Sequence, residues 1–140
     1  MKGKYLLLFC FFVFFSCNTD TVYDPLNVRI VTDHLAWDIG TPTHESIITM
    51  QADDEKTLFA CFQLDKIWTD GYNITPQPTF QWYYDGKKLD YSHWSSLDIK
   101  GPDSTELNTS YECVQNNKKI KVVVNWGNQT GSAETTITIK

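Results

Sequence analysis

Short runs in which apolar and polar residues alternate, separated by turn-forming residues, extend from about residue 27 to the C-terminus. The clearest run is 133–140, where Ile137 and Ile139 share one face with Ala133 and Thr135 while charged residues and further threonines take the other. A period of two is typical of a strand that buries one face. No segment keeps a helical period over three turns, so the pattern predicts an all-β chain. The predicted strands are 27–33, 46–51, 57–64, 79–84, 87–90, 96–99, 107–114, 119–126 and 133–140.

The residues between these runs have the chemistry of tight turns. Asp85-Gly86 is a two-residue hairpin signal, and the polar stretch from Gly127 to Gly131 suits a second hairpin loop. Many short strands at such spacing indicate a sandwich or a barrel. We therefore expect an antiparallel β-sandwich of about seven to nine strands.

The N-terminal residues have the composition of a targeting signal. Lys2 and Lys4 form a basic head, and residues 5–15 contain no charge, proline or glycine. This run is shorter than the roughly 20 apolar residues that a membrane-spanning helix needs. We predict that residues 1–16 are a removable signal peptide, that 17–27 form a polar tether, and that 28–140 form one domain.

The junction Ser16-Cys17 places a small residue before a cysteine at the end of the apolar run. It resembles the lipobox of bacterial lipoproteins of the Bacteroidetes type, which implies a lipid on Cys17 and a location in the cell envelope, at the outer membrane or in the periplasm. The alternative is an ordinary secretory signal cut near the same point, which would release the protein as a secreted one. Both interpretations predict export.

Charge and cysteine content narrow the possible functions of the processed chain. Removal of Lys2 and Lys4 would leave 10 basic against 17 acidic side chains, a net charge of about −7. Such a surface repels phosphate backbones, so nucleic-acid binding is not expected. Cys61 and Cys113 remain, and an oxidising compartment would let them form a disulfide if their Cα atoms lie within about 7 Å. The alternative is two buried free thiols.

Cys61 lies in the predicted strand 57–64, Trp82 begins the stretch Trp-Tyr-Tyr-Asp-Gly-Lys-Lys-Leu, and Tyr111 stands two residues before Cys113. This order of residues resembles the pattern of the immunoglobulin superfamily. The resemblance implies an immunoglobulin-like sandwich in which a Cys61–Cys113 disulfide packs against Trp82 and Tyr111 forms a tyrosine corner. A second alignment makes 119–126 the penultimate strand, and the Tyr111 match is then accidental and the disulfide does not follow.

No motif predicts catalysis. His34, His44 and His93 are scattered, and there is no phosphate-binding glycine-rich loop, no zinc-type cysteine spacing and no nucleophile with a neighbouring base. Asp53-Asp54-Glu55 is more typical of a solvated turn than of a calcium site. The chain is therefore expected to be no enzyme and to need no cofactor or metal.

Aromatic residues in the predicted loops are the best candidates for ligand binding, because Tyr and Trp give large contact areas at low entropy cost. The alternative is that Trp37, Trp68, Trp94 and Trp126 only cover the ends of the core. We predict a non-catalytic binding or adhesion module whose partner is a protein or a carbohydrate at the cell surface. A carbohydrate-binding module and an inhibitory or structural accessory lipoprotein are the alternatives. The candidate ligand-binding residues are Trp68, Tyr72, Tyr91, Trp94 and Trp126.

Overall fold

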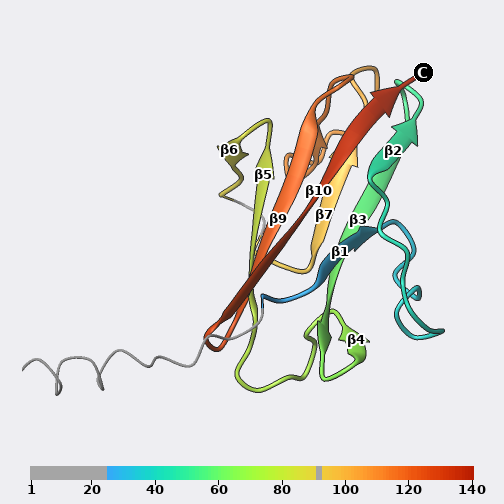
Figure 1. Ribbon diagram of the computed structural model, residues 1–140. Helices are drawn as coiled ribbons and strands as arrows, with labels where there is room; N and C mark the ends of the chain where they lie inside the picture. The colour runs from blue at the N-terminus through green and yellow to red at the C-terminus, as the bar shows by residue number, and fades with distance from the viewer. Residues whose placement is uncertain (1–24, 91–92) are drawn as a thin grey trace, which may run out of the picture.

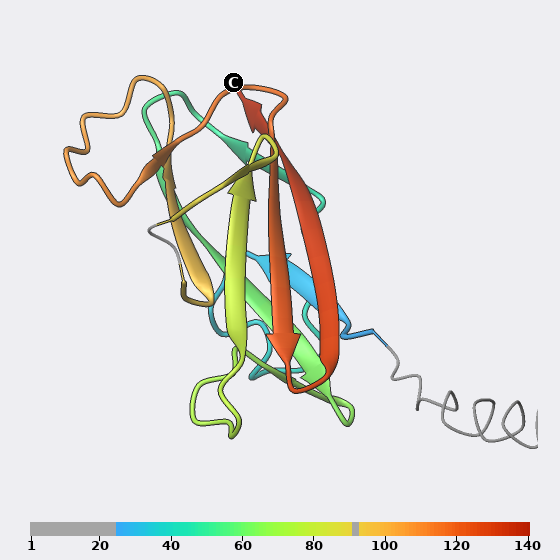
Figure 2. The same ribbon diagram turned by 90° about the vertical axis from the view of Figure 1, so that its left-hand side faces the viewer.

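A computed structural model describes residues 25–90 and 93–140 of the chain, and these form an all-β sandwich of two sheets (Figures 1 and 2). The predicted fold class is confirmed. The predicted signal peptide, Cys17, most of the tether and Tyr91 lie outside the described residues. The first sheet holds β1 (Val28–Val31), β3 (Glu55–Leu64), β7 (Ser96–Lys100) and β8 (Glu112–Cys113) in that order, with β4 (Ile67–Thr69) paired to β3. The second sheet runs β2 (Ile47–Met50), β10 (Gln129–Ile139), β9 (Lys119–Trp126), β5 (Thr79–Tyr84) and β6 (Lys87–Lys88).

Alternation along the long strands places one apolar set between the sheets. Trp82 of β5, Val122 of β9 and Ala133 of β10 are matched across the second sheet and are all buried. On β3 the buried residues Leu58, Ala60 and Phe62 face them from the first sheet. Figure 2 looks onto the second sheet, with β5 in yellow-green, β9 in orange-red and β10 in red in front of the first. The alternation read from the sequence thus assigns the core side of each strand.

Trp82 lies in the middle of this core with 0 % of its surface exposed. Its indole N–H donates a hydrogen bond of 2.9 Å to the carbonyl oxygen of Trp94. A buried indole needs such a partner, because an unpaired buried donor loses the free energy of its bonds to water. This hydrogen bond therefore also links the segment before β7 to the second sheet.

Three features of the topology differ from the predictions. The sandwich is not purely antiparallel, because β2 pairs parallel to β10 and β7 pairs parallel to β8. The predicted loop 65–78 contains the short strand β4. The predicted strand 107–114 is reduced to Glu112–Cys113, because side-chain oxygens of Ser104, Glu106 and Asn108 accept the backbone N–H groups two residues further on. Such local hydrogen bonds compete with a strand ladder.

A second, smaller cluster lies on the outer face of the first sheet, the face turned away from the second sheet. Val31, Cys61 and Trp68 are buried there without belonging to the main core. The loop 32–45 covers them, with Trp37 packed edge-on against Phe59 at a ring separation of 6.2 Å. We call this the outer cluster. The loop 32–45 therefore shields the outer face of the first sheet from water. The sequence pattern did not show what covers this face.

Candidate functional site

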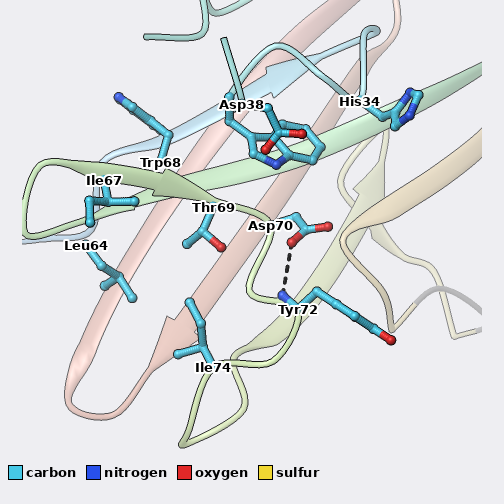
Figure 3. Close-up of a pocket in the computed structure, with 10 residues that line it drawn as sticks. His34, Asp38, Leu64, Ile67, Trp68, Thr69, Asp70, Tyr72 and Ile74 are labelled. Carbon is cyan, nitrogen blue, oxygen red and sulfur yellow. Dashed lines mark hydrogen bonds between the residues drawn. The ribbon is translucent and has the colours of Figure 1, made fainter. Parts of the chain in front are cut away.

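An open hollow of about 570 Å³ lies where the loop 32–45 meets β4 and the segment before β5 (Figure 3). Its wall is made by aromatic and aliphatic side chains together with two carboxylates. Figure 3 shows Asp38 and His34 on one side of the hollow, and Asp70 and Tyr72 on the other. The residues that line it are His34, Trp37, Asp38, Leu64, Ile67, Trp68, Thr69, Asp70, Tyr72 and Ile74.

The loop 32–45 is held firmly at its base, which positions Trp37 and Asp38. The Glu45 carboxylate accepts hydrogen bonds from the backbone N–H of Thr32 at 2.5 Å and from its hydroxyl at 2.9 Å. The Arg29 guanidinium donates to the carbonyl of Pro42 and lies 4.5 Å from the centre of the Trp68 ring. The cation and the indole therefore support the loop and β4 together.

His44 closes the base of the same loop and links the two sheets. Its Nδ1 accepts the backbone N–H of Ile30 at 3.0 Å, so the ring proton is on Nε2, which donates to the carbonyl of Glu134 at 2.8 Å. Ile30 belongs to β1 and Glu134 to β10. His44 is thus a structural histidine at the edge of the sandwich.

The other wall of the hollow is shaped by tight turns. Asp65 and Lys66, between β3 and β4, both have positive φ angles, as a two-residue hairpin turn requires. The Asp70 carboxylate accepts the backbone N–H of Tyr72 at 3.0 Å, the bond drawn in Figure 3. Gly71 has φ +83° and its missing Cβ would lie 2.3 Å from Cγ of Pro78, so only glycine fits. These turns leave Tyr72 80 % exposed.

The four candidate aromatic residues within the described part of the chain do not gather at one site. Trp68 and Tyr72 line the hollow, although Trp68 exposes only 8 % of its surface and serves mainly as its floor. Trp126 packs against the core, and its indole N–H donates to the carbonyl of Pro76 at 2.9 Å. Trp94 is 76 % exposed and does not line the hollow. Two of these candidates therefore line the hollow, one packs against the core, and one is exposed elsewhere.

The predicted disulfide is not formed, because both thiols are free. Cys113 pairs with Lys100, and Lys100 pairs with Glu55, six residues along β3 from Cys61. Six residues of strand span about 20 Å, far more than the roughly 7 Å between Cα atoms that a disulfide allows. The two cysteines lie in one sheet, not in facing sheets, so the Cys61–Cys113 bridge was a wrong prediction.

Tyr111 is not buried at a corner of the sandwich. It is partly exposed, and the nearby Asp98 carboxylate raises the pKa of its phenol. Tyr84 makes the corresponding contact instead, since its hydroxyl accepts the backbone N–H of Gln115 at 2.8 Å. Burial raises the pKa of Tyr84. The tyrosine that ties the segment between β8 and β9 to the second sheet is therefore Tyr84.

Sequence reasoning missed five polar or aromatic members of the hollow, which are His34, Trp37, Asp38, Thr69 and Asp70. The stretch 33–45 is rich in turn residues and shows no strand period, which was the available signal for a long functional loop. Its position over the first sheet depends on the bonds of Arg29, His44 and Glu45 described above. Those contacts join residues 13 or more positions apart, so no local pattern predicts them.

The described part of the chain holds no group of three or more side chains arranged to bind a metal ion. Between residues 25 and 140, leaving aside 91 and 92, no helix has the length and apolar character needed to cross a membrane. Comparison of the chain with protein-family models, with curated proteins and with solved structures found no match.

Proposed function

We propose that this chain is a non-catalytic, exported and lipid-anchored binding module with an immunoglobulin-like sandwich, whose hollow beside β4 receives a protein partner. The observation that carries the proposal is the hollow itself, with exposed apolar side chains at its rim. Ile67 and Tyr72 are 69 % and 80 % exposed. Exposed apolar groups around a concave wall that contains tryptophan are typical of protein-interaction sites.

The charge of the hollow indicates the chemistry of the partner. Asp38 and Asp70 contribute carboxylates to the lining, and among the residues that the structure describes no lysine or arginine lines it. Complementary charge raises association rates and excludes wrong partners. We therefore expect a partner segment that carries an apolar side chain next to a lysine or an arginine.

Substitution at the rim tests this function. We expect Tyr72→Ala and Ile67→Ser each to weaken binding of the native envelope partner about tenfold or more, since an anchor side chain at such a site contributes about 1.4 kcal/mol or more. The measurement is capture of the partner from native envelope extract with immobilised protein, followed by titration of the identified partner. Thermal unfolding of each variant shows that the fold is intact.

Leu107→Ser is the matched control, because Leu107 is 90 % exposed and does not line the hollow. This variant should bind the partner as the unsubstituted protein does. Equal loss in all three variants, or retention of the partner by both rim variants, would contradict the proposed site.

Export and the lipid on Cys17 are tested by mass spectrometry of the protein from its native host. We expect loss of residues 1–16 together with an added lipid mass on Cys17. A processed chain without the added mass would point to secretion, and an unprocessed chain would contradict export. The same spectrum should show no loss of two hydrogens, since Cys61 and Cys113 are free.

Carbohydrate binding is a second candidate function. It is favoured by Tyr72 and Trp94, which are 80 % and 76 % exposed and could stack on sugar rings. A shared sugar site predicts that Tyr72→Ala and Trp94→Ala reduce binding of the same glycan. A protein partner in the hollow predicts that only Tyr72→Ala has an effect.

A further inference from the structure

A row of polar side chains crosses the outer face of the second sheet, on the opposite side of the sandwich from the hollow. Strand pairing aligns Lys88 of β6 with Tyr83 of β5, Tyr83 with Lys121 of β9, and Lys121 with Glu134 of β10. Adjacent strands are about 4.8 Å apart, so the row is about 14 Å long. Lys119 stands two residues from Lys121 on the same face, and we call these five residues the lysine row.

The lysine row carries three lysines and one carboxylate, that of Glu134, so it has a net positive charge. Lys119 pairs with Glu134 at 3.2 Å, and the neighbouring Lys118 pairs with Asp85 at 3.0 Å. Lys88 and Lys121 are exposed and have no ion-pair partner among the described residues. Because the processed chain would be acidic overall, this concentration of positive charge marks a preferred surface for an anion.

The surface is also hollowed. Between β5, β9 and β10 an open depression of about 340 Å³ is lined by Tyr83, Gly86, Lys119, Lys121, Val123 and Glu134. Gly86 leaves open space, since nothing lies within 4 Å of the position its Cβ would occupy. Tyr83, aligned between two lysines, gives the depression a flat apolar surface beside positive charge.

We propose that the lysine row binds an acidic polysaccharide, with a sugar ring against Tyr83 and its carboxylate or sulfate groups against Lys88 and Lys121. A chain of sugar rings carries both parts of the required chemistry, an apolar ring face and regularly spaced negative charge. Glu134 offers an acceptor for a sugar hydroxyl at the end of the row. This site is separate from the hollow and does not depend on its function.

The position of the lysine row leaves it accessible in a tethered protein. The chain joins the sandwich where the backbone N–H of Leu26 donates to the carbonyl of Thr130, beside the turn between β9 and β10. Lys119 and Lys121 occupy the opposite end of β9. Under the proposed lipid anchor the lysine row would lie at the end far from the membrane.

The test compares charged polymers with uncharged polymers of the same backbone. The probes are polygalacturonate with its methyl ester, and dextran sulfate with dextran, measured by calorimetric titration. We expect one or both acidic polymers to bind, the uncharged ones not to bind, and affinity to fall as salt is added. The two acidic polymers separate carboxylate from sulfate recognition.

Two variants with the same change in net charge locate the site. Lys88→Gln/Lys121→Gln should weaken binding about tenfold, whereas Lys66→Gln/Lys140→Gln should change it less than about twofold. Tyr83→Ala, which leaves the charge unchanged, should weaken binding severalfold. Thermal unfolding of each variant confirms that the fold is kept.

Three results would overturn the proposal. The first is equal loss in both double-lysine variants, which would indicate general charge attraction. The second is binding by neither acidic polymer at physiological salt. The third is lysine-dependent binding to anionic phospholipid vesicles or to a single-stranded DNA while both polysaccharides fail, which would assign the surface to a different class of partner.

Discussion

Trp82→Ala should lower the free energy of unfolding by about 3–5 kcal/mol, because it empties the centre of the core and leaves the carbonyl of Trp94 without its donor. This is a large part of the roughly 5–15 kcal/mol that stabilises a typical domain. The measurement is urea unfolding followed by circular dichroism. If Trp82→Ala fails to fold, Trp82→Phe keeps most of the apolar volume and isolates the smaller loss of the hydrogen bond.

Trp94→Ala is the matched control, since it also removes an indole. Trp94 is largely exposed and contributes only its backbone carbonyl to Trp82, so its substitution should change stability by no more than about 0.5 kcal/mol. A cost of under about 1 kcal/mol for Trp82→Ala, or equal costs for both variants, would show that Trp82 is not the centre of the core.

Stability should fall steeply in alkaline solution because of Cys61. Burial raises the pKa of this thiol from 9.0 to about 12, an effect that the positive charge of Arg29 only partly offsets. The unfolded thiol loses its proton near pH 9 while the folded thiol keeps it, so unfolding releases a proton between pH 9 and pH 12. The contribution of Cys61 is therefore complete below pH 9 and is lost as the pH rises towards 12. We expect a loss of about 3 kcal/mol by pH 11.

The comparison of unfolding free energies between pH 8 and pH 11 separates Cys61 from other groups. Cys61→Ala should flatten the decline, whereas Cys113→Ala, which alters an exposed thiol, should leave it unchanged. Tyr84 and Tyr111, whose pKa values are also raised, are common to all variants and cancel in the difference. Identical slopes for the original protein and Cys61→Ala would show that this thiol is not held in its neutral form.

The location of Cys61 also explains why the disulfide expected from the immunoglobulin-like pattern does not form. Ala60 and Phe62 belong to the core between the sheets, so Cys61, between them on β3, faces the outer cluster. An inter-sheet bridge needs a cysteine that faces the other sheet. Strand alternation around Cys61 contained this information, because Leu58, Ala60 and Phe62 form the more apolar set.

The candidate site could be predicted only in part. Trp68 and Tyr72 were identified because they are aromatic residues in a predicted loop, and both line the hollow. Trp126 was chosen because it stands at the edge of a predicted loop, but its indole donates to the carbonyl of Pro76. A single sequence cannot separate these roles, since the difference depends on which backbone carbonyl lies beside each indole.

The strand pattern by itself determined the class of fold and the buried side of the main strands, because a period of two and turn residues such as Asp85-Gly86 are local properties. Only the tertiary structure decided what covers the outer face of the first sheet and which strands are neighbours. Those outcomes rest on contacts between distant residues, such as His44 with Glu134 and Tyr84 with Gln115. The hollow and the lysine row both arise in this way, since strand register and loop packing bring their residues together from separate parts of the chain.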